Sequence, residues 1–302
     1  MPNVSVVLPV YNGEASLEET LQSIFAQSEG DFELIAIDDG STDGTRALLE
    51  DHARRDPRVR VLVQENAGIT RALLRGCQAA TAAVIARHDC GDVSHPDRLR
   101  RQLDILDMRP DVALVSCSAV IRGPAKERLY VVKGDGDNVR HSLLHDDAST
   151  ILGLPHHGSA MFRREAYEAA GGYRAEFYFG QDIDLWIRIA ALGGVHILPE
   201  SLYEATLNVS AISATYRKEQ VTMLSIATNL RDSHDPRWLD EAAAVRPSKT
   251  GRSAADEARA LYFIASCLKR EGNPAWRRYA TQAVTRWPLL LRAWTLFVRP
   301  RP

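Results

Sequence analysis

The chain has 302 residues, of which 45% are hydrophobic and 25% are charged, and its formal net charge is −2. This length and composition allow one large α/β core with a smaller appendage. The near-neutral charge argues against nucleic-acid binding, because that function needs enough Lys and Arg to neutralise several phosphates. The four cysteines form no C-x-x-C pair, which argues against a structural zinc site and against a disulfide framework: Cys77, Cys90, Cys117 and Cys267. No signal-peptide pattern precedes the first apolar segment, so a reducing cytoplasm is the expected location.

The first third of the chain alternates between strand and helix patterns. Val4–Val10 predicts a buried strand, and the apolar residues Leu17, Leu21, Ile24 and Phe25 recur after it at helical spacing. Further strands are expected at residues 32–37, 59–64 and 83–88, and further helices at 42–54, with Ser41 or Thr42 as N-cap, and at 69–80. This alternation predicts an α/β fold with a doubly wound, mostly parallel sheet that helices cover on both faces.

Polar and aromatic residues follow three of the expected strands. Tyr11 follows the first strand, Asp38 and Asp39 follow the second, and Asp89 follows the fourth. Because ligands of such sheets bind beyond the carboxyl ends of the strands, these residues are expected to meet in one crevice. Tyr11 could lie against a nucleotide base and Asp39 could accept a base N–H, as a uracil-like ring requires. The alternatives are a surface tyrosine and an aspartate that caps a turn or a helix.

Four segments in this order resemble the family 2 inverting glycosyltransferases: residues 4–13 (VSVVLPVYNG), 37–45 (IDDGSTDGT), 89–92 (DCGD) and 181–186 (QDIDLW). The resemblance covers about the first two thirds of the chain. It implies a GT-A-like α/β domain that moves a sugar from a nucleoside diphosphate donor, with UDP favoured. The implied acceptor is a hydroxyl of a glycan or lipid-linked molecule in cell-surface polysaccharide synthesis, and the implied stereochemistry is inversion.

The resemblance also assigns roles to individual residues. It places six residues at the donor nucleotide: Pro9, Tyr11, Asp38, Asp39, Arg71 and Asp89. Asp89 and Asp92 would bind Mn²⁺ or Mg²⁺ on the donor diphosphate, since these ions prefer oxygen ligands. Asp182 would take the proton of the acceptor hydroxyl, and His157 and Gln181 would contact the acceptor or the diphosphate.

Each assignment has a plainer alternative. Residues 89–92 could form a simple strand-to-helix turn, and Arg71 could be a solvated residue at a helix start. His156 and His157 could be ordinary core or surface histidines. Asp182 and Asp184 lie near the start of a helix expected through residue 192, where early aspartates commonly act as caps. The helix dipole favours ionised carboxylates at this place and would keep Asp182 in its basic form at neutral pH.

Three positions depart from the family pattern. Gly91 stands where relatives have a metal-binding Asp, which predicts weaker metal affinity. Asp92 could move in, His88 could substitute, or Asp89 and phosphate oxygens alone could hold the metal. Thr206 and Asn208 stand where relatives often have Arg and His beside the leaving diphosphate. The alternative function is therefore a catalytically degenerate GT-A-fold protein that binds a glycan, a nucleotide or a protein partner.

The last part of the chain is expected to be helical and accessory, which divides the protein into residues 1–214 and 215–302. Residues 251–302 contain 10 basic and 3 acidic residues, a balance of +7. The Trp-, Leu- and Arg-rich segment 287–299 is too short and too charged to span a bilayer. It would suit peripheral contact with the inner face of the plasma membrane. The alternatives are a helical hairpin packed on the catalytic domain and a homodimer contact.

Overall fold

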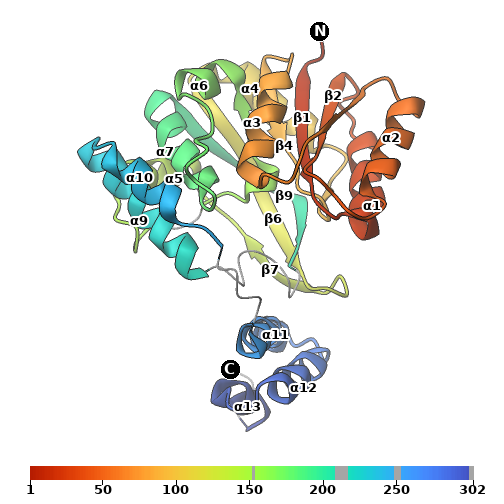
Figure 1. The fold of residues 1–302 in the computed structure, drawn as a ribbon, viewed down its shortest axis with the longest axis vertical. Helices are drawn as coiled ribbons and strands as arrows, with labels where there is room; N and C mark the ends of the chain where they lie inside the picture. Colours follow the sequence, from red (N-terminus) through yellow and green to blue (C-terminus); the bar gives the residue numbers. More distant parts are fainter. Residues whose placement is uncertain (152–153, 208–216, 248–252, 299–302) are drawn as a thin grey trace. The chain divides into compact units, whose positions relative to one another are not determined.

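The computed structural model describes residues 1–151, 154–207, 217–247 and 253–298. In these ranges nine strands form one sheet, in the order β3-β2-β1-β4-β8-β6-β9-β5, with β7 paired to β6 (Figure 1). The strands are β1 (Val4–Val10), β2 (Phe32–Asp38), β3 (Val59–Val63), β4 (Val84–Arg87), β5 (Val93–Ser94), β6 (Val112–Arg122), β7 (Arg128–Val132), β8 (Met161–Arg163) and β9 (Gly194–Thr206). The predicted strands of the first third of the chain are therefore confirmed to within two residues at each end.

Strands β1 to β4 form the parallel part of the sheet, and their register decides which residues meet. Val10 lies level with Asp38 across the β1–β2 pair, and Asp38 lies level with Val63 across the β2–β3 pair. Val7 lies level with Arg87 across the β1–β4 pair. Residues that follow these strands therefore emerge at the same edge of the sheet, as the sequence predicted.

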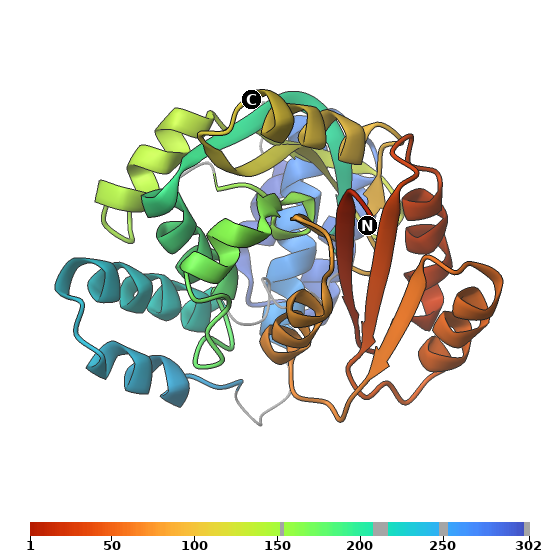
Figure 2. The ribbon, with the colours of Figure 1, turned by 90° about the horizontal axis from the view of Figure 1, so that it is seen from above.

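Alternate residues of β1 pack against helices on opposite faces of the sheet. The helices that flank it are α1 (Glu14–Phe25), α2 (Thr45–Arg55) and α3 (Ile69–Ala79). Val4, Val6, Leu8 and Val10 join one buried cluster with Leu17, Leu21 and Ile24 of α1 and Leu49 of α2. Val7 faces α3, where a Cβ atom added to Gly76 would lie 2.6 Å from its side chain. Figure 2 shows α1 and α2 on one side of the strands and α3 on the other, so the doubly wound arrangement is confirmed.

Beyond β4 the sheet continues with antiparallel strands, which the sequence had not revealed. β8 pairs antiparallel with both β4 and β6, and β5 pairs antiparallel with β9. The chain just before β8 forms the short 3-10 helix η1 (His157–Ser159). The Arg87 N–H donates to the Ala160 carbonyl at 2.8 Å, so η1 lies beside the end of β4. The antiparallel strands thus add a second group of residues at the carboxyl edge of the parallel strands.

The remaining helices of the α/β unit are α4 (Arg98–Met108), α5 (Gly136–His145), α6 (Arg164–Ala169), α7 (Gln181–Leu192), α10 (Arg237–Ala244) and α9 (Arg217–Ser233), whose residues 217–220 belong to the other compact unit. The chain forms two compact units, and residues 221–245 belong to the α/β unit. There the Arg231 guanidinium donates to the carbonyls of Leu143 and Asp146, at 2.9 and 3.0 Å. The predicted boundary between residues 214 and 215 lies outside the described residues and stays a prediction.

The second compact unit contains residues 120–131, 206–220 and 246–302. Its helices are α11 (Ala254–Arg270), α12 (Trp276–Arg286) and α13 (Leu291–Val298), as the predicted C-terminal helical extension requires. A capping box of Ser253 and Asp256 begins α11. Glu127, in the β6–β7 hairpin, accepts from the Tyr279 hydroxyl at 2.9 Å. In the described ranges, none of the helices is both long and apolar enough to cross a bilayer.

Candidate active site

The turn after β2 is fastened to the turn after β1 by side-chain hydrogen bonds. The Asn12 N–H donates to Ser41 Oγ at 3.0 Å, and the Thr42 N–H donates back to Asn12 Oδ1 at 2.8 Å. The Gly13 N–H donates to Thr45 Oγ1 at 2.8 Å. Since Ser41 and Thr42 hold this turn, α2 begins only at Thr45, and the prediction that one of them caps the helix is wrong.

Asp38 and Asp39 are both buried, and both accept hydrogen bonds from the backbone. Asp38 Oδ1 accepts from the Ser41 N–H at 3.0 Å. Asp39 Oδ1 accepts from the Ala67 N–H and from Gln64 Nε2, at 2.9 and 2.7 Å, and Oδ2 accepts from the Gly68 N–H at 2.9 Å. Asp39 thus fixes the turn that leads into α3. Any contact with a nucleotide base has to be made beside these bonds or in exchange for one of them.

An open hollow of about 560 Å³ lies beside this turn. Its lining residues are Asp38, Gly40, Ser41, Arg46, Val63, Gln64, Glu65 and Asn66. Of the predicted donor residues only Asp38 lines it, and Arg46, in the first turn of α2, was not predicted. Pro9 lies in β1 level with Ile37, Tyr11 is exposed, and Arg71 is exposed in the first turn of α3. Their predicted roles are compatible with these positions and stay predictions.

Arg87 lies fully buried at the end of β4 and donates in four directions. Its guanidinium reaches the carbonyls of Val7 and His88, both at 2.9 Å, Asp89 Oδ1 at 2.6 Å and His157 Nε2 at 3.3 Å. Burial by itself would raise the pKa of Asp89, but the Arg87 charge and the neighbouring histidines together outweigh burial and hold that pKa well below its usual range. Asp89 is therefore ionised at neutral pH. Sequence reasoning missed Arg87, although a charged residue in the otherwise apolar strand β4 was a signal.

Asp89, Asp92 and His156 form a cluster in which one possible ligand atom of each lies within 4.8 Å of the others. Tyr203, on β9, connects the Asp92 side chain to the Asp89 backbone: its hydroxyl donates to Asp92 Oδ2 at 2.9 Å and accepts from the Asp89 N–H at 3.1 Å. Burial lowers the pKa of His156, which keeps the imidazole neutral and able to bind a metal ion. The sequence identified both aspartates, but the histidine comes from another part of the chain.

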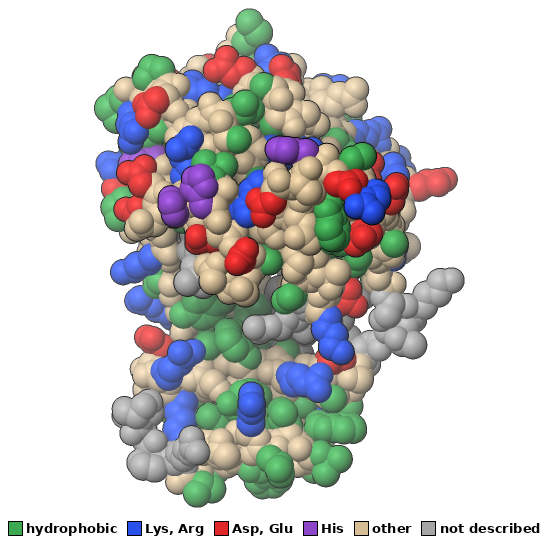
Figure 3. Space-filling view, turned by 90° about the vertical axis from the view of Figure 1, so that its left-hand side faces the viewer, with side chains coloured by type: hydrophobic (Ala, Val, Ile, Leu, Met, Phe, Trp, Pro, Cys, Tyr) green, Lys and Arg blue, Asp and Glu red, His purple; other side chains and the backbone are tan. Residues whose placement is uncertain are grey.

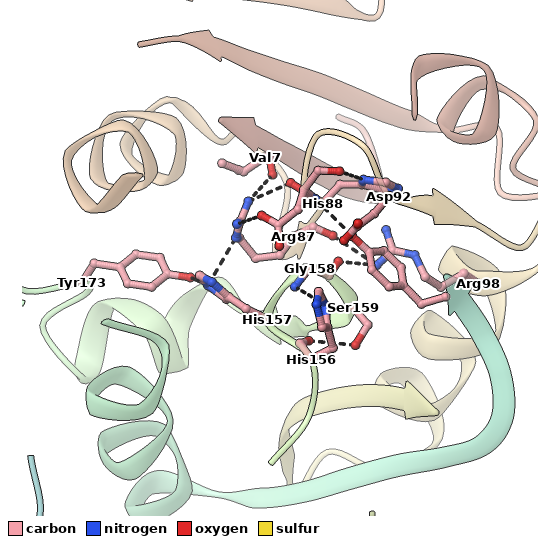
Figure 4. A network of polar contacts seen from close by, with 12 residues as sticks. Val7, Arg87, His88, Asp92, Arg98, His156, His157, Gly158, Ser159 and Tyr173 are labelled. Atoms are coloured by element: carbon pink, nitrogen blue, oxygen red, sulfur yellow. Dashed lines mark hydrogen bonds and ion pairs between the residues drawn. The ribbon is translucent and has the colours of Figure 1, made fainter. Parts of the chain in front are cut away.

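His157 and Tyr173 extend this network toward α7, as Figure 4 shows. His157 Nε2 lies 2.8 Å from the Tyr173 hydroxyl and must accept from Arg87, which can only donate. Burial and the Arg87 charge hold the pKa of His157 well below its ordinary value. This nitrogen is therefore engaged inside the protein, and the predicted contact of His157 with acceptor or diphosphate stays a prediction.

Helix α7 presents Asp182 in its first turn. It follows Gly180, whose φ of 63° is a conformation that favours glycine, and Gln181 is buried. Asp184 is also buried, and it pairs with Arg174 at 3.0 Å and with Arg188. Burial raises the pKa of Asp182 to about 6, nearby Asp89 adds to the rise, and backbone N–H groups oppose it. The carboxylate is still mostly ionised at pH 7, as predicted, but burial outweighs the helix position on which that prediction rested.

Two of the three departures from the family pattern can be located. Gly91 has a φ of 93°, a backbone conformation that residues other than glycine rarely adopt. Thr206 ends β9. Asn208 lies outside the described residues.

A family model described as "Glycosyl transferase family 2" matches residues 5–171, more than half of the chain. The chain belongs to glycosyl transferase family 2. It is accordingly a transferase enzyme. The matched region contains β1 to β4, Asp89, Asp92 and His156, and it ends before Asp182.

Individual relatives agree with this assignment. The chain is 32% identical to the Bacillus subtilis protein named "Putative glycosyltransferase EpsE", over 67% of this chain and 72% of that protein. It is 28% identical to "Amylovoran biosynthesis glycosyltransferase AmsE" of Erwinia amylovora, over 76% of this chain and 87% of that protein.

Solved glycosyltransferases share the fold. The mannosyltransferase PcManGT from Pyrobaculum calidifontis, in complex with GDP-Man and Mn²⁺, superposes with a TM-score of 0.56 at 21% identity, over 98% of this chain and 85% of that one. Residues 1–349 of S. aureus TarS, in complex with UDP, superpose with a TM-score of 0.54 at 16% identity, over 95% and 89%. At these identities the likeness establishes the GT-A fold, and the predicted fold class is confirmed.

Proposed function

We propose that this enzyme transfers a sugar from a nucleoside diphosphate donor, UDP favoured, to a hydroxyl of a glycan or lipid-linked acceptor in polysaccharide biosynthesis, with inversion. One observation carries the proposal: Asp182, a carboxylate with a pKa of about 6, lies within electrostatic reach of the Asp89 and Arg87 pair. A general base works best when its pKa is close to the working pH. The name of the relative AmsE, which refers to amylovoran biosynthesis, supports the polysaccharide assignment.

The reaction in this proposal is a single displacement. The acceptor oxygen forms a bond to the anomeric carbon while the bond from that carbon to the diphosphate oxygen breaks, and the hydroxyl proton passes to Asp182. Arg87 keeps Asp89 ionised, and Arg174 and Arg188 hold Asp184 and thereby fix the first turn of α7. Gln181 and His157 are proposed to position the acceptor or the diphosphate, and Tyr11, Asp38, Asp39, Arg71 and Pro9 to hold the nucleotide.

Asp89, Asp92 and His156 fit a divalent metal ion, since two carboxylates and a neutral imidazole lie within reach of one point. We expect Mn²⁺ rather than Mg²⁺, because Mg²⁺ prefers all-oxygen ligands whereas Mn²⁺ accepts an imidazole more readily. Such an ion would offset the negative charge of the diphosphate. The imidazole would take the place of the carboxylate that is lacking at Gly91.

Calorimetric titration with UDP, GDP and dTDP, each with Mn²⁺ and with EDTA, tests the donor and the metal. We expect one nucleotide to bind, to bind more weakly in EDTA, and to lose most of its metal dependence in His156→Ala but not in the exposed control His141→Ala. If EDTA and His156→Ala leave nucleotide binding unchanged, the metal site is wrong. If no nucleotide binds under any condition, the degenerate alternative replaces the proposed transfer.

Transfer by Asp182→Asn tests the base. We expect this variant to bind the nucleotide as the wild type does and to lose turnover by about 10²–10⁴-fold, the usual contribution of a positioned acid–base group. The control is Asp240→Asn, which removes a carboxylate from the first turn of α10. In the wild type, kcat/KM should fall about ten-fold per pH unit below the Asp182 pKa of about 6. Full turnover by Asp182→Asn would exclude this residue as the base.

A further inference from the structure

The C-terminal unit exposes an apolar stripe along one side of its last helix. Leu291, Trp294 and Val298 of α13 are spaced i, i+3 and i+7, so they share one side of the helix. Leu291 is 74% and Val298 is 82% exposed, and Leu289, just before the helix, is 75% exposed. Ala293 points the other way and is buried in a small core with Ala283 and Val284 of α12. Helix α13 therefore packs through one side and presents an apolar side to the surroundings.

Cations of α11 and α12 lie next to α13, around Trp276. Phe297 contacts Trp276, with ring centroids 5.4 Å apart. The Arg277 guanidinium lies 5.2 Å, and the Lys269 ammonium 5.1 Å, from the centre of the Trp276 ring. Arg277 and Arg292 pair with no carboxylate in the described ranges. In Figure 3 hydrophobic side chains gather on the lower part of the molecule, with Lys and Arg side chains among them.

The charge of the chain is divided unevenly. Residues 251–302 carry 10 basic and 3 acidic residues, or +7, so residues 1–250 carry −2 − 7 = −9. A second copy that met this stripe face to face would bring two like charges together, which disfavours a dimer through it. The combination of exposed Leu, Trp and Val with neighbouring Arg and Lys matches the apolar interior and the anionic surface of a lipid bilayer.

We propose that the exposed side of α13, together with Leu289 and the cations Lys269, Arg277 and Arg292, is a peripheral binding surface for anionic lipid membranes. Within this surface, the apolar side chains enter the boundary between headgroups and acyl chains, and the Arg side chains contact lipid phosphates. Trp294 suits this depth, because its indole N–H already donates to the Pro288 carbonyl at 2.9 Å and its ring is left to contact lipid. The proposal does not depend on the donor or the acceptor of the enzyme.

Vesicle sedimentation with the full chain tests this surface. Vesicles of phosphatidylcholine alone are compared with vesicles that contain equal parts of phosphatidylcholine and phosphatidylglycerol. We expect the wild type to bind the anionic vesicles at least about ten-fold more tightly, because each nearby Lys or Arg favours binding by about five-fold. A protein that binds neither vesicle, or binds both equally well, overturns the proposal.

Two variants with matched controls identify the surface. Leu289→Ser, Leu291→Ser and Val298→Ser together should weaken binding at least about ten-fold, since much buried apolar area is lost. Their control replaces three exposed apolar residues of the other unit by Ser. These are Met108, Leu192 and Val221, which are 69%, 53% and 56% exposed. Arg277→Glu with Arg292→Glu should weaken binding to the anionic vesicles but not to the vesicles of phosphatidylcholine. The control for this variant is Arg54→Glu with Arg55→Glu.

Light scattering distinguishes a dimer from a membrane-binding protein. Vesicle binding that survives both the apolar and the charge variants excludes α13 as the surface. A dimer that only the apolar variant dissociates, in a wild type that binds no vesicles, assigns the stripe to a second copy and overturns the proposal.

Discussion

The two sides of the active site are built from different interactions. On the donor side, Asp38 and Asp39 are held by backbone N–H groups of turns that lie close to them, and the hollow beside them is open. On the other side, the fully buried Arg87 pairs with the partly buried Asp89, among three histidines with lowered pKa values. Hydrogen bonds to the backbone hold a side chain in place at little electrostatic cost, whereas each charge of a buried pair depends on the other for its stabilisation. The second side is therefore where single substitutions should have large effects.

The largest effect is expected from Arg87→Met, which tests this dependence. The variant takes the cation away from the partly buried Asp89 and removes the donor to three further groups, so the free energy of unfolding should fall by about 3–5 kcal/mol. The control Arg109→Met breaks the exposed pair with Asp111 and should cost less than about 1 kcal/mol. Urea unfolding at pH 7.5 measures both. Similar losses in the two variants would show that the pair of Arg87 and Asp89 contributes no more to stability than an exposed pair does.

Low pH should destabilise the fold through the buried histidines beside Arg87 and Asp89. Burial lowers the pKa of His88 to about 3, below its ordinary value of 6.5. The stabilising contribution of neutral His88 is therefore complete above pH 6.5 and is lost progressively as the pH falls toward 3. Between pH 6 and 4.5, His88→Gln should reduce the slope of stability against pH by up to about 1.4 kcal/mol per pH unit. His95→Gln changes an exposed histidine, and an equal reduction there would contradict the assignment.

The parallel side of the fold could be predicted because its signals are local. Apolar residues of β1 alternate between two faces, and the aspartates that follow β2 and β4 are read directly from the sequence. The antiparallel strand β8 has only three residues, too few for a periodic pattern, and it is the element that brings His156 to Asp89 and Asp92. Tyr203 likewise reaches Asp92 across 111 positions of sequence. Such contacts depend on topology, which a single sequence does not specify.

The pKa of Asp182 also depends on the folded structure and could not be predicted from the sequence. Its place at the start of a helix was predicted, but burial, a property of the folded chain, decides that its pKa is raised. Because the folded pKa of about 6 exceeds the ordinary value of 3.8, ionised Asp182 destabilises the fold increasingly between these two pH values and fully above pH 6. Asp182→Asn should thus raise the free energy of unfolding by about 1–2 kcal/mol at pH 7.5 and by less at pH 4.5. Urea titrations at both pH values measure this, and a loss of stability at pH 7.5 would contradict the raised pKa.

The last effect concerns Gly91, which stands where relatives have a metal-binding carboxylate. A Cβ atom added there would meet only the Ser16 side chain, with Oγ at 3.4 Å and Cβ at 3.8 Å, so space does not require glycine, whereas the φ of 93° does. Gly91→Ala should therefore cost about 1–2 kcal/mol, from backbone strain alone. Gly30→Ala is the control, because no atom lies within 4 Å of the added Cβ and the backbone is not left-handed.

Gly91→Asp should carry the same strain, since the strain comes from the backbone and not from the side chain. A restored carboxylate should then lower stability without tightening Mn²⁺ binding, because His156 already occupies the third position of the cluster. Calorimetry with Mn²⁺ and urea unfolding of the same protein measure the two effects separately. Tighter Mn²⁺ binding at unchanged stability would mean that the family's original ligand position is still usable and that His156 is not its replacement.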